Sequence, residues 1–221
     1  MARSDISVVV PVLNDAVHLR RLIEDLHDTD VEIVVVDGGS DDDSMSVAKG
    51  ARVVTAPRGR GTQMAAGAGI ANGEWLWFMH ADTRLSQRVV PALVDRLEKP
   101  RWGFFSVRLD GESWPYRMIE KTMSWRAAAS GIATGDQGIF VHRELLDAVG
   151  GIPRQPLLED VELCRRLRRL AKPIVVPEPL VASSRRWERD GIAQTILVMW
   201  WLRFRYFAGA NPESLAKAYY G

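Results

Sequence analysis

Apolar and amphipathic segments alternate along the N-terminal half of the chain. Residues 6–10 form a short, continuously apolar run, which is typical of a buried strand, and Leu19, Leu22, Ile23 and Leu26 follow at helical spacing. The pattern repeats, with strands predicted at 31–36, 52–55 and 74–79 and helices predicted from about residue 42, at 63–70 and at 87–98. Strands and helices that alternate over short connections predict an α/β fold, with a mostly parallel sheet flanked by helices.

The C-terminal half is less regular. Strands are predicted at 103–109 and 138–141, and helices at 114–130, 144–149 and 160–170. No linker divides this region from the first half. The sequence therefore predicts one domain over residues 1–190, followed by a helical extension over residues 191–221, in the same compact unit or at an interface.

Composition excludes several classes of protein. The 221 residues carry a net charge of +1, which gives no indication of nucleic-acid binding. The single cysteine, Cys164, cannot form an internal disulfide, and four scattered histidines argue against a zinc site. The N-terminal residues lack a signal-peptide pattern, and no apolar run is long enough to span a membrane. We expect a cytoplasmic protein.

Three polar clusters follow predicted strands. They are Asn14-Asp15, Asp37-Gly38-Gly39-Ser40 and His80-Ala81-Asp82. Ligands of open α/β sheets bind outside the carboxyl ends of the strands. Because all three clusters fall at such ends, the sequence predicts a ligand site along that edge.

Two of these clusters have specific candidate roles. The carboxylate of Asp37 can accept hydrogen bonds from a nucleoside; alternatively, it caps the Gly-Gly-Ser turn. His80 and Asp82 are two residues apart on an extended segment, so their side chains share a side and suit a divalent cation that also binds a diphosphate. The alternative is that His80 is a hydrogen-bonded core residue and Asp82 caps a helix.

Further charged positions suit substrate binding or catalysis. Arg58 and Arg60 lie between a strand and a helix, where arginines can contact phosphates, although solvated loop charges are the plainer interpretation. Glu159 and Asp160 open a helix; they are either caps or, if an acceptor hydroxyl reaches them, a general base. Asp136 precedes a strand and offers a polar group to a substrate.

Five short motifs in order resemble family-2 glycosyltransferases of the GT-A (Rossmann-like) fold. They are Val-Val-Pro-Val-Leu-Asn-Asp (9–15), Val-Val-Asp-Gly-Gly-Ser-Asp-Asp (35–42), His-Ala-Asp-Thr (80–83), Gly-Asp-Gln (135–137) and Leu-Glu-Asp (158–160). With Arg-Gly-Arg-Gly-x-Gln-Met (58–64) and Arg-Trp-Glu-Arg (186–189), the chain also resembles a small bacterial subgroup of selenodomain-associated or arsenosugar-type transferases.

The resemblance implies a role for each motif. Asp37 would contact the nucleoside, Asp82 would hold Mg²⁺ or Mn²⁺ and the diphosphate with His80, and Asp160 would deprotonate the acceptor beside Glu159. The implied donor side also includes Pro11, Asn14, Arg58, Arg60 and Gln63, and the implied acceptor side includes Asp136, Gln137, Arg186 and Trp187. The family transfers a sugar from a nucleotide-diphosphate sugar to an acceptor hydroxyl in one displacement that inverts the anomeric centre.

Two motifs depart from the family pattern. The usual Asp-x-Asp is His80-Ala81-Asp82, which leaves the metal requirement open. The Gln-x-x-Arg-Trp of processive members is Ser183-Ser184-Arg185-Arg186-Trp187, which predicts a non-processive enzyme. Two alternatives stay open: a nucleotidyltransferase, and a non-catalytic, sugar-nucleotide-binding or membrane-associated partner subunit.

The segment 192–207 is apolar on nearly every side. Ile192, Ile196, Trp200 and Phe207 share one face of the predicted helix, and the segment also contains two arginines. We expect burial between two surfaces. One alternative is contact with the sheet domain or a second subunit, as in a homodimer. The other is a peripheral position at a membrane surface, in which case the unknown acceptor is a lipid rather than a small molecule.

Overall fold

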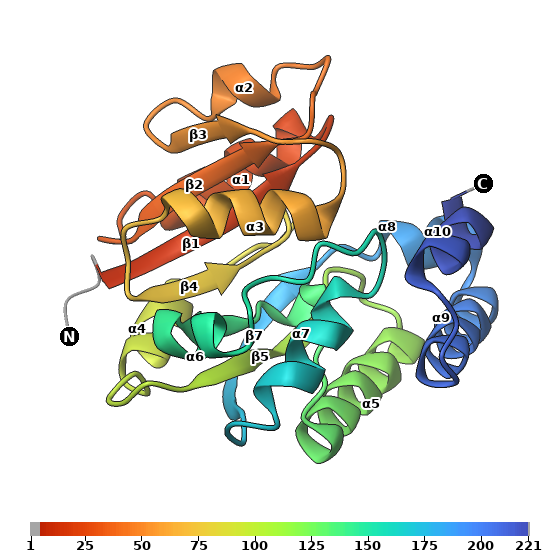
Figure 1. Ribbon diagram of the computed structural model, residues 1–221. Coiled ribbons are helices and arrows are strands. Elements are labelled where there is room, and N and C mark those ends of the chain that lie inside the picture. Colours follow the sequence, from red (N-terminus) through yellow and green to blue (C-terminus); the bar gives the residue numbers. More distant parts are fainter. Residues whose placement is uncertain (1–4, 221) are drawn as a thin grey trace.

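Seven strands form one sheet, in the order β3-β2-β1-β4-β6-β5-β7. The computed structural model describes residues 5–220 (Figure 1). The strands are β1 (Ile6–Val12), β2 (Glu32–Asp37), β3 (Arg52–Thr55), β4 (Trp75–Phe78), β5 (Trp102–Leu109), β6 (Phe140–His142) and β7 (Ile174–Ala182). β6 runs antiparallel to β4 and β5, and the other pairs are parallel. The predicted mostly parallel sheet is confirmed.

Helices cover both faces of the sheet. They are α1 (Ala16–Leu26), α2 (Ser44–Val47), α3 (Arg60–Ile70), α4 (Val89–Val94), α5 (Trp114–Ser130), α6 (Arg143–Ala148), α7 (Glu159–Leu167), α8 (Arg185–Asp190), α9 (Ile192–Phe207) and α10 (Pro212–Tyr220), with a 3₁₀ turn at Gly135–Gln137. One core packs α1 and α4 on one face, and a second packs α3 and α7 on the other. Cys164 lies in the second core, where burial raises the pKa of its thiol to about 12.

One strand escaped prediction. β7 contains Pro177 and Pro179, which resemble a loop in sequence. β7 is one of the two edge strands and pairs only with β5 among the named strands, so a proline without an N–H is tolerated there. The predicted helix at 87–98 is confined to Val89–Val94, and α8 was not predicted, whereas α9 and α10 lie within the helical extension predicted over 191–221.

The C-terminal helices pack on the sheet domain by one face. Leu202 of α9 and Leu215 of α10 belong to the same core as α3 and α7, and the Tyr206 hydroxyl donates to Glu162 of α7. The opposite face of α9 is exposed, with Trp201, Phe204 and other large apolar side chains in solvent. Within this chain, α9 is therefore buried against the sheet domain on one side, and the predicted burial of its other side stays a prediction. Among residues 5–220, no helix is long and apolar enough to cross a membrane.

Candidate active site

The loops after β1 and β2 are tied together at the predicted edge of the sheet. The backbone N–H of Asn14 donates to Ser40 Oγ (2.9 Å), and the Asn14 side-chain oxygen accepts from the N–H of Asp41 (2.7 Å). Asn14 adopts a left-handed backbone (φ 52°), which asparagine tolerates better than most residues. These bonds fix the first two polar clusters against each other, as their shared edge predicted.

Asp37 caps the turn that follows β2. Its carboxylate is 3% exposed and accepts hydrogen bonds from the N–H groups of Gly39 (2.9 Å) and Ser40 (3.1 and 3.2 Å). Arg58 lies above this turn, with Nη2 3.5 Å from the Gly39 carbonyl. The turn-capping alternative is therefore observed, and the nucleoside contact stays a prediction.

Gln63 braces the ends of β1 and β2 from inside the core. Its side-chain nitrogen donates to the carbonyls of Val12 (2.9 Å) and Val36 (2.8 Å), and the residue is 4% exposed. Because both side-chain N–H groups of Gln63 are bonded to backbone carbonyls, this residue shapes the edge of the sheet. These groups are not free to contact a ligand.

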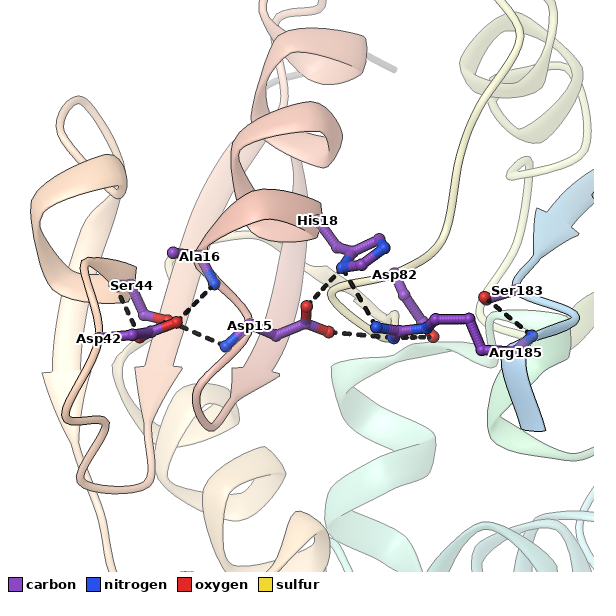
Figure 2. Close-up of polar contacts among 8 residues, drawn as sticks. All are labelled: Asp15, Ala16, His18, Asp42, Ser44, Asp82, Ser183 and Arg185. Atoms are coloured by element: carbon purple, nitrogen blue, oxygen red, sulfur yellow. Dashed lines mark hydrogen bonds and ion pairs between the residues drawn. The ribbon is translucent and has the colours of Figure 1, made fainter. Parts of the chain in front are cut away.

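Arg185 bridges two carboxylates at the same edge. Its Nη2 lies 2.9 Å from Asp82 Oδ2 and 3.4 Å from Asp15 Oδ2, and Asp15 also contacts His18 (Figure 2). Figure 2 shows the guanidinium between the loop after β1 and the segment that carries Asp82. One cation from the start of α8 thus neutralises the predicted metal carboxylate.

A second charged network crosses the centre of the site. Arg60 Nε lies 2.7 Å from Glu159, and Arg60 Nη1 lies 3.1 Å from His80 Nε2. His80 Nδ1 lies 3.2 Å from Asp136. Because arginine only donates, His80 Nε2 accepts its bond and Nδ1 carries the proton toward Asp136.

The charges in this network support one another. Although burial opposes the charge, the carboxylates of Glu159 and Asp160 raise the pKa of Arg60. Burial raises the pKa of Glu159, while Arg60 opposes that shift. Burial also acts against ionisation of Asp136, but the hydrogen bond from His80 holds its pKa below the ordinary value. Arg60 is therefore the central cation of the site.

Asp160 is held rigidly at the start of α7. One carboxylate oxygen accepts from the N–H of Gly135 (2.8 Å) and the other from the N–H of Val161 (2.7 Å). The preceding residue, Leu158, has a left-handed backbone (φ 60°), and among residues 5–220 only Asn14 is another non-glycine residue with positive φ. Such strain persists where the surroundings fix the backbone, commonly at functional sites.

Gly135 must be a glycine for this arrangement. A Cβ atom built there would lie 2.2 Å from His80 Nε2. The predicted Gly-Asp-Gln motif therefore allows the histidine ring to pack directly on the backbone that orients Asp160.

A cleft of about 1600 Å³ joins these groups. The predicted residues that line it are Asn14, Arg60, His80, Asp82, Asp136, Asp160, Arg186 and Trp187. Pro11 and Glu159 lie beneath it, around a cavity of about 10 Å³ that His80 and Asp160 also line. The cleft thus joins three predicted donor residues to three predicted acceptor residues, whereas Asp37 and Arg58 are not among the residues that line it.

Gln137 does not lie on the acceptor side as predicted, because it is 0% exposed. Its side-chain nitrogen donates to the Phe105 carbonyl (3.2 Å), and its side-chain oxygen accepts from the N–H of Thr134 (3.3 Å). Buried polar groups need such partners, so Gln137 anchors the 3₁₀ turn instead of contacting a substrate.

The site fits a divalent cation only through a carboxylate and ligand oxygens. Within residues 5–220, no group of three or more His, Cys, Asp or Glu side chains is placed to hold a metal ion. Both ring nitrogens of His80 are engaged, so its predicted role as a metal ligand does not fit this arrangement. Asp82 does fit a cation held by one carboxylate together with diphosphate oxygens.

Several charged residues of the cleft were not predicted as site residues. Arg185 lay in the quoted motif 183–187 without a role of its own. Arg126 of α5 and Arg203 of α9 also line the cleft. Arginines on helices look like solvated charges in sequence, and only the packing of α5 and α9 brings these two into the cleft that Asp160 lines.

The structure is an α/β fold with a cleft at the carboxyl ends of β1 and β4, where Asn14, His80 and Asp82 line it. The family model described as "Glycosyl transferase family 2" matches residues 7–141, and the chain belongs to this family. A comparison with curated proteins gave no match.

Solved structures share the fold. A mannosyltransferase from Pyrobaculum calidifontis, in complex with GDP-Man and Mn²⁺, is 20% identical (TM-score 0.67; 97% of this chain, 68% of that chain). Residues 1–349 of S. aureus TarS are 18% identical (TM-score 0.66; 83% and 61%). Glucosyl-3-phosphoglycerate synthase from Mycobacterium tuberculosis, in complex with UDP, is 25% identical (TM-score 0.58; 80% and 70%). The chain spans less than two thirds of the length of the TarS fragment.

Proposed function

We propose that the protein transfers a sugar from a nucleotide-diphosphate sugar to an acceptor hydroxyl, with inversion and without processivity. The observation that carries the proposal is the position of Asp160. Its carboxylate is fixed by two backbone N–H groups and lines the same cleft as Asp82, which ends the third polar cluster of the sheet edge. A base and a diphosphate-binding carboxylate in one opening suit a direct displacement.

In the proposed reaction, Asp160 removes the proton of the acceptor hydroxyl. The acceptor oxygen then forms a bond to the anomeric carbon as the bond from that carbon to the diphosphate oxygen breaks. The nucleoside diphosphate leaves with the electron pair. One displacement inverts the anomeric centre and needs one base, which Asp160 supplies.

The donor would lie along the carboxyl ends of β1, β2 and β4. Asn14 and Asp37 would shape the nucleoside end, with Arg58 beside them, and Arg60 would lie near the diphosphate; the bonds that hold Asn14 and Arg58 at the turn after β2 and the position of Arg60 in the cleft support this. Structures of the similar mannosyltransferase and TarS fragment are in complex with GDP-Man and UDP-GlcNAc, and these complexes support a nucleotide-sugar donor here.

Asp82 would hold a magnesium or manganese ion together with the donor diphosphate. Structures of the similar proteins contain Mn²⁺ or Mg²⁺. The bound cation would stabilise the negative charge of the leaving diphosphate. His80 instead orients Asp136 in this proposal, and Arg185 must share or release Asp82 when the donor binds.

The acceptor side would be formed by residues around Asp160. Asp136, Arg186 and Trp187 line the cleft there, and Arg186 lies over the ring of Tyr219 (4.8 Å to its centroid). Glu159 would orient Arg60 through their ion pair, and it is not among the residues that line the cleft. The resemblance to the selenodomain-associated or arsenosugar-type subgroup stays a prediction, as does a cytoplasmic location.

A thermal-shift screen tests the proposed donor. Nucleoside diphosphates and their sugars are compared with and without manganese, because selective binding raises the melting temperature by mass action. Purified protein is then tested for donor hydrolysis and transfer. A nucleotide sugar that raises the melting temperature and is hydrolysed supports the proposal. Binding without hydrolysis or transfer would instead revive the partner-subunit alternative.

A further inference from the structure

Two arginines without anionic partners within 4.0 Å line the same cleft as Asp160. Arg126 of α5 donates from Nη1 to the Ile132 carbonyl (3.0 Å), while its Nη2 is buried without a hydrogen-bond partner. Nε of Arg203 on α9 is likewise buried without a partner. With the other residues in 5–220, Arg203 makes neither a hydrogen bond nor an ion pair within 4.0 Å. Both side chains line the cleft.

Nearby carboxylates favour these charges but do not pair with them. Burial lowers the pKa of Arg126 to about 10, and the charge of Arg203 contributes to the shift. Burial also lowers the pKa of Arg203. Asp160 favours both cations and Asp136 favours Arg203, but neither carboxylate forms an ion pair with them, and the Asp160 oxygens already accept two backbone N–H bonds. Both guanidinium groups stay charged at neutral pH, and a half-buried cation without a partner is destabilising.

We propose that Arg126 and Arg203 bind a phosphate or carboxylate group of the acceptor, next to the hydroxyl that Asp160 deprotonates. The guanidinium fork matches both anions with paired hydrogen bonds. This inference rests on the proposed function, since it describes the acceptor of that reaction.

The position of the pair favours the acceptor over the donor. The donor side is marked by Asp37 and Asp82 at strand ends, whereas Arg126 and Arg203 lie on helices α5 and α9 and interact electrostatically with Asp160. The neighbouring lining is apolar, with Met123 and Met199, which strengthens the attraction between a guanidinium and an anion.

The anion has two possible sources. One is a soluble acceptor that carries a phosphate or carboxylate. The other is the phosphate of a lipid, whose chain would follow the outer cleft past Trp125 (73% exposed) and Trp200 (65% exposed). The charged group is the same in both.

Binding of inorganic phosphate tests the pair. It is measured calorimetrically on protein saturated with a nucleoside diphosphate and manganese, so that the donor site is filled. The variants are Arg126→Gln and Arg203→Gln. The matched control is Arg205→Gln, on the same helix but outside the cleft, with its guanidinium over the Trp201 ring.

We expect phosphate affinity to fall about ten-fold or more in both cleft variants, the scale of a charge-assisted bond, and to be unchanged in the control. Melting temperature should stay equal or rise, because an unpaired buried charge is removed. Equal phosphate binding by all four proteins would overturn the proposal. So would a parallel loss of nucleoside diphosphate affinity, which would assign the arginines to the donor.

Competition then identifies the source of the anion. Glycerol 3-phosphate and monomeric dodecyl phosphate are each tested for displacement of inorganic phosphate. Displacement by both compounds, or by glycerol 3-phosphate alone, assigns a soluble acceptor, and displacement by dodecyl phosphate alone assigns a lipid. Displacement by neither contradicts the proposal. These binding experiments need no turnover, so their result stands apart from any failure to detect sugar transfer.

Discussion

The guanidinium of Arg185 lies 2.9 Å from the carboxylate of Asp82 and within 3.4 Å of Asp15. The ion pair joins the start of α8 to the segment after β4, and both side chains are partly exposed. A cation from the chain thus occupies the surroundings of the carboxylate proposed to hold a metal. If Asp82 holds the cation and the diphosphate as proposed, donor binding and manganese binding would compete with Arg185 for the same oxygens.

Asp82→Ala should abolish donor turnover and the manganese-dependent part of nucleotide binding, because it removes the best placed metal carboxylate. Nucleotide affinity is titrated at several manganese concentrations. A variant with unchanged manganese dependence would remove Asp82 from this role. His80→Ala should change the manganese dependence little, since its ring nitrogens contact Arg60 and Asp136.

Arg185→Gln tests the competition directly. Loss of a half-exposed ion pair changes a binding equilibrium modestly, since such pairs contribute about 0.2–1 kcal/mol. We expect the manganese concentration for half-maximal nucleotide binding to fall about two-fold to five-fold. A rise would mean that Arg185 assists the diphosphate more than it competes with the cation.

Elements whose own residues carry a clear hydrophobic or polar pattern could be predicted from the sequence. The apolar run at 6–10 and the polar cluster after it predicted β1 and the site edge, because a strand end fixes where its next side chains lie. β7 was missed because Pro177 and Pro179 are read as loop unless the edge position is known. No sequence pattern indicates that Arg126 and Arg203 line one cleft, since that depends on how α5 and α9 pack.

Motifs also did not reveal how each residue is used. Gln63 and Gln137 belong to matching motifs, yet both are buried and bonded to backbone carbonyls or N–H groups. Spacing places such residues near a site. Only the hydrogen bonds distinguish a residue that supports the loop from one that reaches a ligand.

Asp37→Ala should weaken nucleoside binding by about 1.5–3 kcal/mol, the scale for hydrogen bonds to a charged group. A nucleoside monophosphate should show the same loss as the intact donor, because the contact is to the nucleoside. The melting temperature must be measured alongside, since Asp37 also caps Gly39 and Ser40. A loss of stability with unchanged affinity would leave Asp37 as a turn residue only.

Glu162 should stabilise the protein in a pH-dependent way. Burial opposes its charge, but hydrogen bonds from Arg165, Tyr206 and Arg166 lower the pKa of Glu162 to about 2. The folded carboxylate therefore binds a proton less readily than the unfolded one, and its contribution is complete above the ordinary pKa of about 4.3 and is lost as pH falls through about 2.

Glu162→Gln tests this dependence. We expect a lower melting temperature at pH 7 and a difference from the unmodified protein that shrinks toward pH 2. Glu98→Gln, at an exposed position, is the matched control. A difference that stays constant with pH would show that Glu162 stabilises α9 without its charge.

The exposed face of α9 should bind anionic membranes. Trp201, Phe204 and Phe207 are exposed, Arg205 stacks on Trp201, and α9 contains no acidic residue. Aromatic and basic side chains together favour the interface of an anionic bilayer. Phe204→Ser with Phe207→Ser should lower partition into phosphatidylglycerol vesicles at least about five-fold, given the apolar area that two phenyl rings bury.

Met45→Ser, another exposed apolar position, is the control for that change. Sedimentation without vesicles measures the alternative. A dimer that the paired substitution dissociates, with no vesicle binding by the unmodified protein, would assign this face to a second copy of the chain.

Asp160→Asn is the most direct test of the proposed mechanism. A general base contributes about 10²–10⁴-fold, so transfer should fall by that factor. Donor affinity should barely change, because the base acts on the acceptor. The amide keeps one oxygen for the Gly135 or Val161 N–H, whereas alanine would lose both bonds and mix catalysis with the stability of the start of α7.

Transfer rate, donor dissociation constant and melting temperature are measured on the same variant. Near-normal transfer would exclude Asp160 as the base and direct attention to Asp136, which lines the same cleft. A large fall in melting temperature with a matching loss of binding would mean that Asp160 is structural. A loss of rate with binding and stability retained is the result that the fixed carboxylate predicts.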